Sequence, residues 1–115
     1  QIGVPVYLAG QVSGTEGYVE AIRSGLHVAF AVTAQLRGEQ LPPLPKHTVF
    51  GALLDYATNP ETVDYQPSHV NFGMLEPLEP PIRNKKARYA AYAQRGNAAL
   101  KDYRKALCAV GLLSE

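Results

Sequence analysis

The N-terminal third of the chain carries two hydrophobic patterns. Residues Val4 to Ala9 form a short run of β-branched and aromatic residues, which predicts a buried strand. From Thr15 to Arg37 the apolar positions recur with helical spacing, and Gly38 is typical of the residue just beyond a helix end. We therefore expect a strand, a turn and a long helix.

The turn between this strand and helix is rich in glycine. Ser13 followed by Glu16 is a capping-box pattern, which places the helix start just after Ser13. The free N–H groups and positive dipole end of the helix would then face outward and favour an anion or an electron-rich ring. Small residues at every fourth position would let a backbone or a flat ligand come close. These residues are Gly17, Ala21, Gly25 and Ala29. A buried helix packed against a sheet explains the same pattern.

The middle of the chain predicts a connector and a short helix. Residues 41–45 read LPPLP, which excludes a helix or a central strand because proline fixes φ and lacks an N–H. Thr48 is the expected cap of a helix that runs to Tyr56 and stops at Asn59-Pro60. Gly51 within this helix favours close packing.

Residues 61–81 contain four prolines around a short apolar run. We expect an ordered loop, with a flexible linker as the alternative. In this loop Asn71 offers a donor and an acceptor, Phe72 a flat face and Gly73 an open backbone, a set that suits a flat ring such as a pterin. Equally, Asn71 and Gly73 would form a turn while Phe72 fills the core.

The last predicted helix, from Arg83 to Ala109, is amphipathic. Its apolar stripe consists of Tyr89, Ala93, Gly96, Leu100, Tyr103, Leu107 and Val110. Basic residues with interleaved tyrosines near its start suit a phosphate backbone and unpaired bases, and a solvated helix face is the alternative. The basic residues are Arg83, Lys85, Lys86, Arg88 and Arg95, and the tyrosines are Tyr89 and Tyr92.

Charge is unevenly distributed along the 115 residues, although the formal net charge is only +1. Residues 1–80 carry three basic and eight acidic side chains and residues 81–115 carry eight basic and two acidic ones, giving −5 and +6. The single cysteine, Cys108, excludes an internal disulfide and fits a reducing compartment, so we expect a cytoplasmic protein. The sequence contains no membrane-spanning run, signal peptide or metal-ligand spacing.

Four motifs resemble those of one family in order and spacing. The string AGQVSGTEGYVEAIRSGL resembles the flavin-contacting turn and helix of the folate- and FAD-dependent tRNA (uracil-5-)-methyltransferases, where the pattern runs near AGQITGVEGYVESAASGL. Three later strings are similar to further motifs of that family: GALLDYAT, DYQPSHVNFGMLEPL and RNKKARYAAYAQRGNAALKDY. Two positions depart from the family, because Ala21 replaces a usual Ser and His69 stands where many relatives have Asn.

The resemblance implies an enzyme that forms 5-methyluridine in the tRNA T-loop. Methylenetetrahydrofolate would supply the carbon, reduced FAD the hydride, and NAD(P)H would recharge the flavin. The parent would have an α/β FAD-binding flavoprotein fold, and this chain would be a mostly α fragment with one short strand, three helices and ordered loops. Family members are several times longer, and Gln1 is not an initiator Met, so we expect a C-terminal portion that cannot hold FAD tightly or catalyse alone.

The resemblance also divides this portion of the FAD-binding domain into three parts. Residues 1–40 are the final strand, glycine turn and flavin-facing helix, residues 41–81 are the connector, short helix and NFG loop, and residues 82–115 are the basic helix. The flavin would be bound by Gly10, Gln11, Gly14, Glu16, Gly17 and Tyr18. The folate side would be formed by Asn71, Phe72 and Gly73, and tRNA would contact Arg83, Lys85, Lys86, Arg88 and Arg95.

No catalytic residue is expected in this segment. Cys108 matches no catalytic motif of the family and has no adjacent His or Lys, so the nucleophilic thiolate would lie upstream. The expected partners are tRNA and the missing N-terminal part of the same protein, without a membrane or DNA. Two alternatives fit parts of the pattern: a related flavin-dependent enzyme that modifies the tRNA wobble uridine, and a noncatalytic RNA-binding module built on the basic helix.

Overall fold

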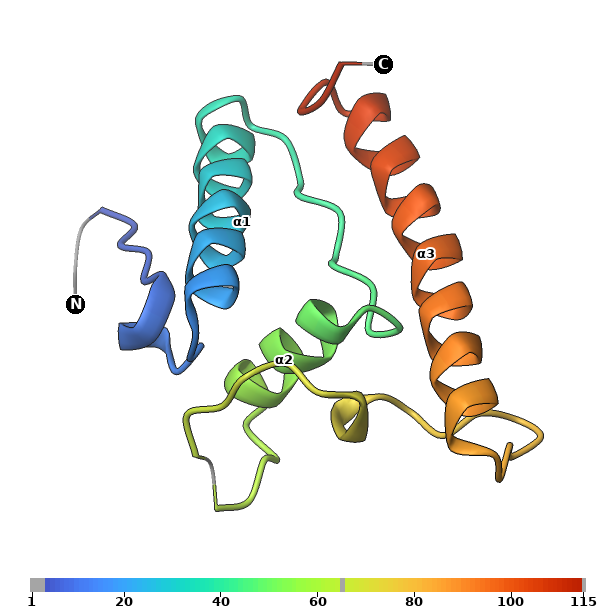
Figure 1. Cartoon of the computed structure of the whole chain (residues 1–115). Helices are drawn as coiled ribbons and strands as arrows, with labels where there is room; N and C mark the ends of the chain where they lie inside the picture. The colour runs from blue at the N-terminus through green and yellow to red at the C-terminus, as the bar shows by residue number, and fades with distance from the viewer. Residues whose placement is uncertain (1–3, 65, 115) are drawn as a thin grey trace.

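The computed structural model describes residues 4–64 and 66–114, which contain three α-helices and two short 3-10 helices but no sheet. The elements are η1 (Gly10–Ser13), α1 (Tyr18–Leu36), α2 (Val49–Thr58), η2 (Phe72–Met74) and α3 (Lys85–Ala109). α1 and α3 run in the same direction on two sides of the molecule, and α2 lies between them (Figure 1). The prediction of a mostly helical chain with three helices is confirmed.

The strand predicted at Val4 to Ala9 does not form in the described part of the chain. Residues 5–9 have no regular secondary structure, and Val4, Val6 and Leu8 are 68%, 63% and 62% exposed. A strand needs a neighbouring strand to satisfy its backbone N–H and C=O groups. The described residues offer only one isolated parallel bridge, between Thr15 and Ser68. The prediction of a buried strand is therefore wrong for this chain.

α1 begins at Tyr18 rather than at Thr15. Its N-cap residue is Gly17, with φ +99°, and no side chain caps it. The Ser13 hydroxyl instead donates a 2.7 Å hydrogen bond to the Gly10 carbonyl, and the Glu16 carboxylate accepts from the Gln11 amide at 3.3 Å. The predicted capping box of Ser13 and Glu16 is wrong, because Gly17 turns the chain between that pair and the helix.

The C-terminal end of α1 follows the prediction. Gly38 has φ +68°, and its N–H donates to the Gln35 carbonyl at 3.1 Å. The N–H of Glu39 donates to the Ala34 carbonyl at 2.8 Å. This pair of hydrogen bonds is the Schellman arrangement, which satisfies carbonyls that the helix end leaves free.

α2 supplies three of the seven buried hydrophobic residues in the described part of the chain, more than any other element. Thr48 caps it as predicted, since its hydroxyl accepts from the Gly51 N–H at 3.0 Å. Leu53 is fully buried, and Phe50 and Ala52 are buried beside it. Asn59 follows the last helical residue, which confirms the stop expected at Asn59-Pro60.

α3 is docked over only part of its predicted apolar stripe. It begins at Lys85, where the Asn84 side chain accepts from the Ala87 N–H at 2.8 Å. Tyr103 and Leu107 are buried, whereas Tyr89 and Leu100 remain 38% and 46% exposed. Near its C-terminal end the Arg37 guanidinium donates to the Gly111 carbonyl at 2.7 Å, which ties the ends of α1 and α3 together.

Two glycines allow the packing to be tested with a matched pair of variants. A Cβ at Gly51 would overlap the Pro45 carbonyl oxygen, whereas nothing lies within 4 Å of a Cβ at Gly25 in α1. We expect Gly51→Ala to destabilise the chain by about 1–3 kcal/mol because the backbone must shift. Gly25→Ala should stabilise it by about 0.5–1 kcal/mol through helix propensity. Urea unfolding followed by circular dichroism measures both, and equal effects would contradict the packing of Gly51.

Candidate functional site

An open hollow lies at the N-terminus of α1 and has a volume of about 490 Å³. It is lined by Gln11, Thr15, Glu16, Gly17, Tyr18, Ala21 and His69, and we refer to it as the α1 hollow. Four of the residues expected to contact a flavin line it: Gln11, Glu16, Gly17 and Tyr18. The helix tip is open to a ligand, since the ring of Tyr18 beside it is 92% exposed.

Gly10 and Gly14, the other two expected flavin contacts, shape the turn behind the α1 hollow. The Gly10 N–H donates to the Ser24 hydroxyl at 2.9 Å, and its carbonyl accepts from the Thr15 hydroxyl at 2.8 Å. A Cβ at Gly10 would lie 3.8 Å from the Ala21 Cβ, so the turn sits directly against α1. Gly14 is buried and has φ +90°. These two glycines act on the shape of the hollow and do not line it.

Glu20 and His69 join the first turn of α1 to the loop that follows α2. The buried Glu20 carboxylate accepts from the Val70 N–H at 3.1 Å and lies 3.5 Å from His69 Nδ1. The hydrogen bond from Val70 lowers the pKa of Glu20, and burial opposes this shift. A Cβ at Gly17 would lie 2.9 Å from both side chains, so only glycine fits there.

The electrostatics of the α1 hollow favour the second of the two ligands expected there, an electron-rich ring, over an anion. No side chain caps α1, so N–H groups of its first turn stay available to a ligand. The Glu20 carboxylate, however, already lies in that turn, and Glu16 lines the hollow. A phosphate would be repelled by these two carboxylates. The arrangement therefore suits an uncharged ring edge that accepts and donates hydrogen bonds.

The residues expected on the folate side lie away from the α1 hollow. Phe72 packs its ring 4.8 Å from that of Tyr89 and 5.6 Å from that of Tyr92 on α3. The Asn71 amide donates to the His69 carbonyl at 3.3 Å, and the Asn71 carbonyl accepts from the Met74 N–H at 3.2 Å. Asn71 thus takes part in a turn, and Phe72 packs against α3, as in the alternative interpretation of this loop. Among the loop residues, His69 lines the α1 hollow.

The five basic residues expected to contact tRNA fall into two groups. Arg88 donates to the Arg83 carbonyl at 3.1 Å, and Arg95 donates to the Glu76 carbonyl at 2.8 Å. Both guanidinium groups also lie over tyrosine rings, at 5.6 Å and 5.3 Å from the centroids. Arg88 and Arg95 therefore hold the loop against α3. Arg83, Lys85 and Lys86 are exposed.

A partly buried cluster of polar groups lies where the three helices meet. The Arg23 guanidinium of α1 lies 5.3 Å from the centroid of the Phe50 ring of α2. Burial lowers the pKa of His27, and the charge of Arg23 lowers it further. Burial raises the pKa of Tyr103 on α3, and Arg23 opposes that shift. These groups link the helices and lie outside the α1 hollow.

Residues 4–64 and 66–114 contain no group of three or more His, Cys, Asp or Glu side chains that could hold a metal ion. The helices of this part of the chain are too short or too polar to span a membrane.

Comparison with known proteins identifies relatives of this chain. The family described as "Glucose inhibited division protein A" matches residues 4–40. Proteins named methylenetetrahydrofolate--tRNA-(uracil-5-)-methyltransferase TrmFO are similar to 89% of the chain: those of Syntrophomonas wolfei, Solibacter usitatus and Streptococcus agalactiae are 37%, 40% and 44% identical. The chain spans only 23%, 24% and 22% of these relatives. No solved structure matches it. The resemblance drawn from the four motifs is confirmed.

The link between Glu20 and Val70 predicts a pH dependence of stability. Because the folded-state pKa of Glu20 is lowered, its contribution is present above the usual glutamate pKa and is lost as the pH falls through the folded value. Glu20→Gln should remove this part of the acid sensitivity of the unfolding free energy. Glu39→Gln, which removes an exposed carboxylate, should retain the wild-type profile. Identical pH profiles for wild type and Glu20→Gln in urea titrations would contradict this role.

Proposed function

We propose that the chain is the C-terminal segment of a tRNA (uracil-5-)-methyltransferase that forms 5-methyluridine with methylenetetrahydrofolate and FAD. The similarity to enzymes of that name over 89% of the chain carries this proposal. The family match at residues 4–40 includes every residue that lines the α1 hollow except His69. The same match does not extend to the basic helix α3. A noncatalytic RNA-binding module built on α3 alone is therefore not favoured.

The residues around the α1 hollow fit a flavin ring. Bound there, the flavin would supply the hydride that reduces the transferred carbon. The uncapped N–H groups of the first turn of α1 would donate hydrogen bonds to the acceptor atoms at the pyrimidine edge of the ring. The Gln11 amide would add a hydrogen bond, and the exposed Tyr18 ring would flank the stacking face. Gly10 and Gly14 would keep the turn compact behind it.

Folate and tRNA would approach from the loop and from α3. Asn71, Phe72 and Gly73 form an ordered turn beside α3, and we assign the folate wall to this region. Arg83, Lys85 and Lys86 are exposed and would contact tRNA phosphates. In this proposal NAD(P)H recharges the flavin, the catalytic thiolate lies outside this chain and the enzyme works in the cytoplasm.

An exposed apolar surface indicates how the segment joins the rest of the enzyme. It comprises Val4, Val6, Leu8, Val12, Val19, Ile22 and Leu26, on the N-terminal segment, η1 and α1. So many exposed large apolar side chains in one part of a chain are typical of an interface. The relatives are about four times longer than the chain, so we assign this surface to the remainder of the FAD-binding domain, where residues 4–9 would find strand partners.

This assignment predicts that the 115-residue chain alone does not retain FAD. A flavin needs walls that bury most of its surface, and the α1 hollow provides only one of them. The absorbance spectrum of the purified chain should therefore show far less than one flavin per protein. A near-stoichiometric flavin spectrum would contradict the need for the remainder of the enzyme.

Gly17 provides a test in the longer protein that carries this segment. Gly17→Ala must hold an alanine at φ +99° with its Cβ against Glu20 and His69, whereas Gly25→Ala meets no neighbour. Strain of about 1–2 kcal/mol at the hollow would weaken FAD binding by about tenfold. Flavin titration of the apoprotein measures this change. Unchanged FAD affinity in Gly17→Ala would remove the α1 hollow from the flavin site.

A further inference from the structure

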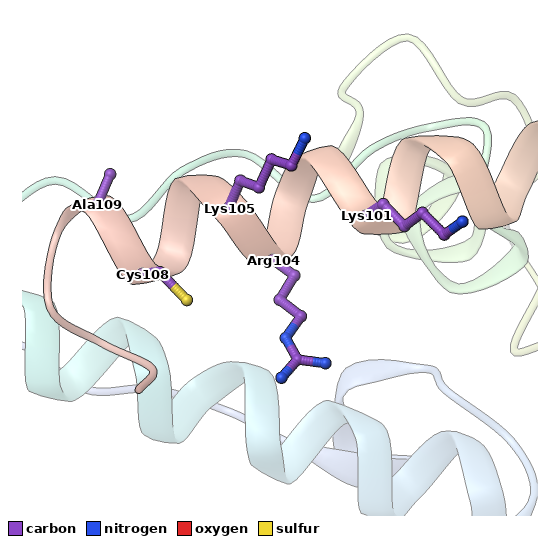
Figure 2. A pocket seen from close by; sticks show the side chains of 5 residues that line it. All are labelled: Lys101, Arg104, Lys105, Cys108 and Ala109. Atoms are coloured by element: carbon purple, nitrogen blue, oxygen red, sulfur yellow. The ribbon is translucent and has the colours of Figure 1, made fainter. Parts of the chain in front are cut away.

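A second basic site lies on the C-terminal half of α3, away from the basic residues at the start of that helix. A groove of about 510 Å³ there is lined by Lys101, Arg104, Lys105, Cys108 and Ala109, and we call it the α3 groove. Figure 2 shows all five residues on one helix, with Arg104 and Cys108 extending toward α1. The three cationic side chains are exposed.

These three cations are not used by the fold. Arg88 and Arg95 hold loop carbonyls, and Lys46 lies 3.4 Å from the Asp55 carboxylate. In contrast, Lys101, Arg104 and Lys105 form no salt bridge or hydrogen bond with any described residue. Asp102 is the single acidic residue of α3, and it forms no salt bridge in the described part of the chain either. The positive charge of the α3 groove is therefore left to a ligand outside the chain.

Helix geometry extends this charge into a line. Residues at i+3 and i+4 lie beside residue i, so Arg104 and Lys105 both neighbour Lys101, while these two side chains point to different sides of the helix (Figure 2). Arg104 follows Lys86 by five full turns, which places the two on the same face about 27 Å apart. A single small anion cannot span that distance. A polyanion can, and exposed cations gain more from a polyanion because each phosphate contact releases bound counterions.

We propose that Lys101, Arg104 and Lys105 bind RNA phosphates and, with Lys86, form an RNA-binding strip along the length of α3. This inference rests on the proposed function, because an enzyme acting on tRNA requires such a surface. It moves part of the RNA contact from the start of α3 to its C-terminal half. The bound RNA would follow the helix past Cys108 toward the end of α1 (Figure 2).

The test is tRNA binding to the 115-residue chain as a function of salt. Lys101→Gln, Arg104→Gln and Lys105→Gln combined should reduce the slope of log affinity against log salt by about 2, at 0.7 to 0.9 per lost phosphate contact. A control that keeps the charge, Lys101→Arg, Arg104→Lys and Lys105→Arg combined, should retain the slope. Fluorescence anisotropy with labelled tRNA measures both, and circular dichroism verifies that α3 is intact.

The outcomes separate this inference from the proposed function. An unchanged slope in the neutralised variant overturns the inference. Equal loss of binding to tRNA and to polyglutamate would instead assign the α3 groove to an acidic protein segment, which also overturns it. The proposed function is measured independently, as 5-methyluridine formation by the longer wild-type protein, and its absence there would overturn that proposal whatever the slope.

Cys108 offers a second measurement, because it is the single cysteine of the chain and lines the α3 groove. Bound RNA should slow its reaction with a maleimide at least severalfold in the wild type, and not in the neutralised variant. A cysteine placed at exposed Ala29 on α1, in a Cys108→Ser background, serves as the control site. Equal protection of both positions would contradict RNA binding at the groove.

Discussion

The joint between the glycine turn and the loop after α2 organises the candidate site. The Glu16 N–H donates to the Ser68 carbonyl at 2.9 Å, and the Ser68 N–H donates to the Gly14 carbonyl at 3.1 Å. The Glu20 carboxylate adds the hydrogen bond from the Val70 N–H. Without these contacts, the loop would not bring His69 to the N-terminus of α1. The joint also directs the loop toward Phe72, which packs against the tyrosines of α3.

The parts of the fold that were predicted correctly depend on local interactions. Thr48 caps α2 through a residue three positions away, and Gly38 ends α1 through hydrogen bonds within one turn. The predicted strand depends on partners far away in sequence, and the described residues contain none for Val4 to Ala9. In the longer protein proposed above, this hydrophobic pattern would fit a strand of a sheet.

The same distinction explains what was foreseen of the site. Four residues of the α1 hollow lie within one short motif, so a family pattern was enough to find them. The contact between Glu20 and His69 was not predicted, because it joins positions about fifty residues apart. No spacing within a local sequence motif indicates a contact of that kind. A signal was present for Glu20, since an acidic residue in the first turn of a helix is favoured by the dipole. The capping-box pattern of Ser13 and Glu16 instead led to the prediction that Glu16 is the acidic residue at the start of the helix.

The sequence gives the number of basic residues along α3, but it does not show which of them pair with other groups of the fold. Of the eight basic residues after position 80, the interleaved tyrosines favoured the first five as RNA contacts, from Arg83 to Arg95. The structure separates them by their partners, because Arg88 and Arg95 turn back to loop carbonyls whereas Lys101, Arg104 and Lys105 meet none. A cation that already satisfies a carbonyl must break that contact before it binds a phosphate, whereas an unpaired exposed cation loses only water and counterions. In the proposed complex with RNA, the affinity would therefore come mainly from the cations that the fold leaves unpaired.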